Sequence, residues 1–120
     1  MKPILIAVAA LYAAVIASTV GLAEGSAEQF YKSRFFLSGL LARGAGVCGG
    51  DWKRTLKIAL ELVKTAELRA ISNAYPKTVE QWGLEGAAAF NNGVMTEGIG
   101  PTCAYLATVC RDAEAIVRGH

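Results

Sequence analysis

Two kinds of hydrophobic pattern follow one another along this chain. From Ile4 to Ile16 the residues are continuously apolar, whereas after residue 26 the apolar residues recur at intervals of three and four. Such intervals place side chains on one side of an α-helix. The sequence has few signs of strands, such as β-branched residues that alternate with polar ones. The pattern therefore predicts an all-α domain behind an apolar leader.

Glycine and proline residues mark the limits of the first and last helices. The first helix is expected over 27–43 and ends at the Gly44-Ala45-Gly46 segment. The last follows the turn at 98–100, has Pro101 at its first position, where proline is well tolerated, and ends near Arg118. Glu114 lies four residues before Arg118, so the two are expected to pair across one turn.

The second helix is expected to start at Trp52. Asp51 precedes it, and an aspartate side chain accepts hydrogen bonds from the free amide groups at a helix start. Thr65 either continues this helix or caps a short third one that reaches about Asn73. The core side of the second helix is expected to carry four apolar residues: Trp52, Leu56, Leu60 and Val63.

A capping box predicts the start of the helix before the last one. After the break at Tyr75-Pro76, Thr78 and Gln81 have the spacing at which each side chain satisfies a free amide group. This helix contains Gly83 and Gly86, and another helix backbone is expected to lie close against them; alternatively, the segment 91–93 breaks it. Because short connections favour antiparallel neighbours, the predicted fold is a small up-down bundle of about four helices, or four with one short extra helix.

The apolar leader has the parts of a signal peptide. Lys2 supplies a positive charge, Ile4–Ile16 the apolar region, and Gly21-Leu22-Ala23 the small residues that a signal peptidase reads. We therefore expect a signal peptide at 1–23 and a small α-helical domain at 24–120, exported to the periplasm or secreted. The alternative is an uncleaved leader that anchors the chain in the inner membrane, since about 20 apolar residues span a bilayer.

An exported protein meets an oxidising compartment, where cysteines form disulfides. Cys103 and Cys110 lie on one predicted helix, about 10 Å apart along its axis, whereas a disulfide needs Cα atoms within about 7 Å. In an up-down bundle, Cys48 and Cys103 lie at the same end. We therefore predict a Cys48–Cys103 disulfide and a buried free thiol at Cys110. Pairing of Cys48 with Cys110, or of Cys110 between two chains, is the alternative.

No residue pattern predicts catalysis, a cofactor or a metal site. The single histidine, His120, ends the sequence, so a serine or cysteine nucleophile lacks an evident base. Zinc takes four close Cys, His or carboxylate ligands, which the sequence does not group together. The 12 basic and 10 acidic residues nearly balance, which argues against a nucleic-acid partner. A small hydrolase or redox enzyme that uses Glu97, Tyr105 or a reactive cysteine is the alternative.

Two sets of residues are candidates for binding. Tyr75, Trp82, Asn91 and Asn92 form the predicted interaction patch, because aromatic anchors and hydrogen-bonding side chains are typical of interfaces. A basic stripe on the second helix is either a hydrated face or a surface for anionic lipid headgroups or an acidic partner. Its members are Lys53, Arg54, Lys57 and Lys64.

In size, leader, helix content and few cysteines, the chain resembles small periplasmic helical proteins, such as acid-stress chaperones and immunity proteins against secreted toxins. This resemblance rests on no shared motif and assigns no residues. We expect a non-enzymatic binding or accessory module of the bacterial envelope, with a protein partner and with membrane contact only through an uncleaved leader. An envelope-stress or chaperone-like role is the alternative.

Overall fold

The computed structural model describes residues 26–119, which form five helices and no strand. The helices are α2 (Ser26–Cys48), α3 (Trp52–Glu61), α4 (Ala66–Ala74), α5 (Pro76–Glu97) and α6 (Ile99–Arg118). The predicted all-α class is thus confirmed. The predicted signal peptide and its alternative, a membrane anchor, lie outside the described residues.

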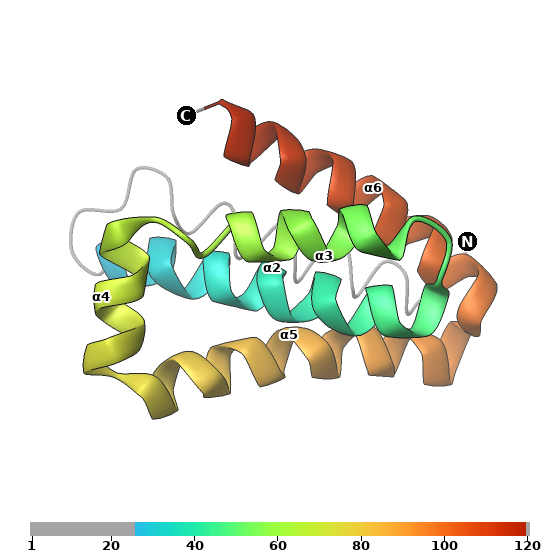
Figure 1. Cartoon of the computed structure of the whole chain (residues 1–120). Helices are drawn as coiled ribbons and strands as arrows, with labels where there is room; N and C mark the ends of the chain where they lie inside the picture. The colour runs from blue at the N-terminus through green and yellow to red at the C-terminus, as the bar shows by residue number, and fades with distance from the viewer. Residues whose placement is uncertain (1–25, 120) are drawn as a thin grey trace.

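Four of the helices alternate in direction, as in the predicted up-down bundle. α3 returns along α2, α5 runs in the same direction as α2, and α6 returns again, while the short α4 crosses between α3 and α5 (Figure 1). The α4 helix is capped by Thr65, whose hydroxyl accepts a hydrogen bond from the Leu68 amide at 3.2 Å. The largest fully buried side chains come from α2, α4, α5 and α6 and from the residue that caps the end of α3: Leu37, Leu41, Leu68, Phe90, Val109 and Leu62.

The backbones of α2 and α5 touch where glycines face each other. A Cβ atom on Gly39 would lie 2.8 Å from the Cα of Gly83, and one on Gly86 would lie 2.9 Å from the backbone nitrogen of Leu40. Both distances are too short for a real Cβ contact. The predicted close approach of a helix backbone is therefore confirmed. α5 continues without a break through the segment 91–93.

The first helix is longer than predicted. Gly44 does not end α2, because it is buried against α6, where a Cβ atom would lie 2.6 Å from a methyl carbon of Leu106. Its lack of a side chain serves helix packing. The chain turns only after Cys48, at Gly49 and Gly50, whose φ angles of +69° and +56° favour glycine.

The predicted capping box is wrong. α5 begins at Pro76, so Thr78 lies inside the first turn, and the Gln81 side-chain amide contacts Glu85 at 3.5 Å. Proline suits the first helical position, since its fixed φ matches the helix and its missing N–H is not needed there. Pro101 was predicted to begin the last helix, but α6 begins two residues earlier, at Ile99.

Apolar contacts and buried hydrogen bonds join α3 to α2. Ile58, Ala59 and Leu62 are buried. The Ser38 hydroxyl donates to the carbonyl of Ala59 at 2.8 Å, and Arg34 Nη1 donates to that of Leu62 at 3.2 Å. Carbonyls at a helix C-terminus lack helical partners and attract cations. Burial lowers the pKa of Arg34, yet its guanidinium is well placed to stabilise this end of α3.

Candidate functional site

The cysteines gather where α2 ends and α6 begins. Cys48 and Cys103 form the predicted disulfide, with Cα atoms 5.7 Å apart. Cys110 is free, as predicted, but it is half-buried rather than buried. All three cysteines line one pocket of about 450 Å³, together with Arg54 and Arg111 among others. Any thiol or disulfide chemistry of the described residues would therefore take place in this pocket.

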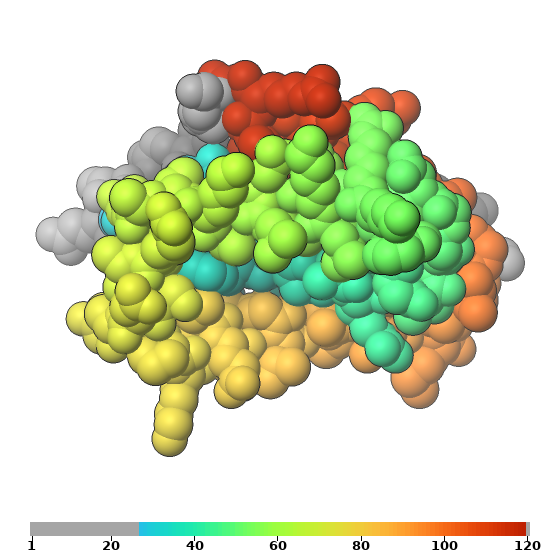
Figure 2. Space-filling view, viewed as in Figure 1, coloured from blue at the N-terminus to red at the C-terminus, as the bar shows by residue number. Residues whose placement is uncertain are grey.

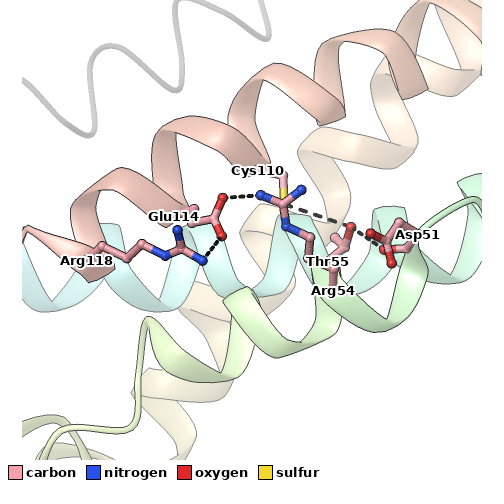
Figure 3. Close-up of polar contacts among 6 residues, drawn as sticks. All are labelled: Asp51, Arg54, Thr55, Cys110, Glu114 and Arg118. Carbon is pink, nitrogen blue, oxygen red and sulfur yellow. Dashed lines mark hydrogen bonds and ion pairs between the residues drawn. The ribbon is translucent and has the colours of Figure 1, made fainter.

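Cys110 belongs to a short chain of hydrogen bonds between α6 and α3. The thiol donates to the Thr55 hydroxyl at 3.9 Å, and that hydroxyl donates to the backbone carbonyl of Asp51 at 3.2 Å (Figure 3). Among residues 26–119, no carboxylate hydrogen-bonds to the thiol. A nucleophilic cysteine needs a nearby base or a low pKa. Cys110 therefore lies at the contact between α6 and α3, where it also packs against the core.

Glu114 is held between two arginines beside this pocket. Its carboxylate binds Arg54 of α3 and also Arg118 Nη2, one turn further along α6, at 2.8 Å (Figure 3). The residue is only 8% exposed, whereas both arginine side chains are mostly in solvent. The hydrogen bond that Arg54 donates to Glu114 raises the pKa of Arg54. The predicted Glu114–Arg118 pair is thus confirmed, and Arg54 extends it into a clamp between α3 and α6.

We expect Glu114→Gln to lower the free energy of unfolding by about 1–2 kcal/mol, because the amide weakens two charge-assisted hydrogen bonds while the arginines regain water. Urea unfolding followed by circular dichroism measures this change. Glu80→Gln, at an exposed position of α5, is the matched control and should leave stability within about 0.5 kcal/mol of the parent. Equal stability of the two variants would contradict the clamp.

The residues of the enzyme alternative do not meet in the cysteine pocket. Neither Glu97 nor Tyr105 is among its lining residues. Burial and the negative charge of Asp112 raise the pKa of Tyr105, so its phenol stays protonated at neutral pH. One Glu97 carboxylate oxygen is buried without a hydrogen-bond partner among the described residues.

Within residues 26–119, no three His, Cys, Asp or Glu side chains are grouped closely enough to hold a metal ion.

The predicted interaction patch is divided between two places. Tyr75 is exposed and Trp82 is half-buried against Phe35, and both line a pocket of about 350 Å³ near α4. Asn91 lies more than two turns further along α5, where it accepts a hydrogen bond from Arg43 at 2.8 Å. Asn92 is exposed next to it. The aromatic half of the patch therefore holds together, and the amide half is separate.

The sequence did not predict the apolar surface on α3. Trp52 and Leu60 were expected in the core, but they are 45% and 66% exposed, and Leu56 is half-buried between them. α3 has apolar residues around more of its circumference than α2 and α6 cover, so part of them faces solvent. A row of lysines borders this strip. We call the six residues the α3 outer face: Trp52, Leu56, Leu60, Lys53, Lys57 and Lys64.

No known protein family, curated protein or solved structure matches this chain. None of the described helices α2 to α6 is both long and apolar enough to cross a membrane.

Proposed function

We propose that this protein is a non-enzymatic binding module, exported to the bacterial cell envelope, that engages its partner through the α3 outer face. The observation that supports this is the exposure of Trp52 and Leu60 on one helix. Large apolar side chains grouped on a surface mark interaction sites, and tryptophan is enriched among the residues that dominate binding energy. A partner that covers these side chains would remove them from water.

The opposite side of α3 is fixed, which suits a binding surface. Arg34 and Ser38 hydrogen-bond to its last carbonyls from α2, and the clamp at Glu114 ties its first turn to α6. A side chain presented by a rigid helix loses little entropy on binding. The engaged polar groups around Cys110 also support a binding role over catalysis.

The export part of the proposal rests on the leader and the disulfide together. The apolar segment from Ile4 to Ile16 and the small residues before Glu24 are typical of signal peptides. The Cys48–Cys103 disulfide is the type of bond that persists outside the reducing cytosol.

A photo-crosslinking amino acid in place of Leu60 tests the proposal in the producing cell. We expect illumination to give adducts with envelope components, either protein or lipid, since Leu60 projects from the proposed binding surface. The matched control is the same substitution at Leu84, an exposed leucine of α5. Adducts that form equally at both positions, or at neither, would argue against the α3 outer face. Recovery of the protein in the cytosol with all cysteines reduced would argue against export.

A further inference from the structure

From the chemistry of the α3 outer face, and resting on the binding function proposed above, we infer that its partner is the surface of an anionic lipid bilayer. The apolar strip of Trp52, Leu56 and Leu60 enters the interface between headgroups and acyl chains, while the lysines contact lipid phosphates. This is the way in which amphipathic helices lie on membranes without crossing them.

The apolar half of this surface is a shallow strip. Trp52, Leu56 and Leu60 follow one another at intervals of four residues, so they lie on one side of α3 and extend over about 12 Å of its axis. With the lysine stems they line a groove of about 430 Å³. Tryptophan is favoured at membrane interfaces, because its ring is apolar and its indole N–H can still reach water.

The charged half supplies the complementarity to anionic lipid. Lys53, Lys57 and Lys64 are exposed and form no ion pair with residues 26–119, and Glu61 is the one acidic residue that lines the same groove. The Lys53 ammonium lies 5.6 Å from the Trp52 ring centroid, so a positive charge already accompanies the aromatic anchor. Lysine stems cover apolar surface while their ammonium groups remain in a polar layer.

The position of α3 in the fold suits a broad partner. In the space-filling view, α3 lies on the outside of the bundle, and α2 is visible in the hollow between α3 and α5 (Figure 2). The exposed apolar residues of α5 lack comparable charges: Leu84 has Glu80 and Glu85 as neighbours along the sequence. Exposed apolar residues and unpaired lysines thus coincide on α3, which selects a negatively charged surface for this helix.

Trp52 fluorescence gives a readout at the proposed contact itself. In a Trp82→Phe background Trp52 is the one tryptophan left, and the full chain as isolated from cells is mixed with vesicles. We expect a blue shift and quenching by brominated acyl chains with vesicles of three parts phosphatidylcholine to one part phosphatidylglycerol. Pure phosphatidylcholine should give neither change. Trp52 reports on α3 whether or not the leader is attached.

Charge variants separate a local contact from general attraction. Lys53→Gln/Lys57→Gln/Lys64→Gln should lower partitioning onto the anionic vesicles about a hundredfold, at about fivefold per lysine. The control removes the same net charge from three exposed positions on other helices: Arg69→Gln/Lys77→Gln/Arg111→Gln. It should change partitioning much less. Higher salt should weaken binding of the parent protein.

Each result decides the inference. A Trp52 response that depends on anionic lipid and on the three lysines of the α3 outer face supports it. No Trp52 response, an equal response to both vesicles, or equal loss in the two triple variants would overturn it. If any of these occurred while Leu60 still crosslinked to a protein, the binding function would stand and its partner would be an acidic protein. Absence of both vesicle binding and crosslinks would remove the function together with the inference.

Discussion

Replacing Gly86 by alanine should lower the free energy of unfolding by about 3 kcal/mol, despite the better helix propensity of alanine. The new Cβ would meet the backbone of α2 at Phe36 and Leu40, with 2.9 Å to the Leu40 nitrogen. Backbone atoms cannot rotate away as a side chain does, so α2 and α5 must move apart. Since these helices share the core, Phe90 and its neighbours would lose contacts over a wide area.

The matched control is Gly46→Ala in α2, where a Cβ atom would meet nothing within 4 Å. The free energy of unfolding of this variant should rise by up to about 1 kcal/mol, because alanine favours the helix and its Cβ atom clashes with no neighbouring residue. Thermal unfolding measures both changes, and the Gly86 variant should melt roughly 15 °C below the parent. Similar melting temperatures for the two variants would show that the backbones of α2 and α5 do not touch.

Loss of the Cys48–Cys103 disulfide should cost about 4 kcal/mol, the larger of the two effects. The bond closes a loop with a sequence separation of 55, and such a cross-link reduces the conformational freedom of the unfolded chain. The variant Cys48→Ala/Cys103→Ala should therefore unfold at a lower urea concentration than the parent. A reducing agent should shift the parent to a similar midpoint.

Cys110→Ala is the control for the disulfide variant. The Cys110 thiol is half-buried and makes one weak hydrogen bond to the Thr55 hydroxyl, so its loss should cost about 1 kcal/mol or less. Reductant should still destabilise this variant, since its disulfide is intact. If the parent kept its midpoint under reduction, the bond would add little to the free energy of unfolding, which would contradict this prediction.

The parts of the fold that depend on local chemistry could be predicted from the sequence. Glycines inside a helix are costly unless they allow a close contact, and Gly86 does so against α2. The disulfide followed from the helix order and from the distance between Cys103 and Cys110. The end of α2 could not be predicted in the same way, because Gly44 would end an isolated helix and is kept helical by its packing on Leu106.

The candidate site was harder to predict, because it depends on which side of a helix its neighbours cover. The hydrophobic periodicity alone predicted that Trp52 and Leu60 lie in the core. In the structure, α2 and α6 instead cover the side of α3 that carries Ile58 and Leu62. Both sides of α3 are apolar, so the sequence holds no preference between them. The same limit applies to Trp82, which packs on Phe35 from α2 instead of standing free beside Tyr75.

The position of the disulfide in the chain affects how the protein resists proteolysis. α3, α4 and α5 all lie between Cys48 and Cys103, and the sulfur bond joins the two ends of this segment. A single cut in the connection between α3 and α4, for example after Lys64, would therefore yield two peptides that remain one covalent molecule. Because the disulfide keeps the two peptides together, their helices can form most of the native contacts again and the nicked protein can refold. Only a second cut would release a fragment.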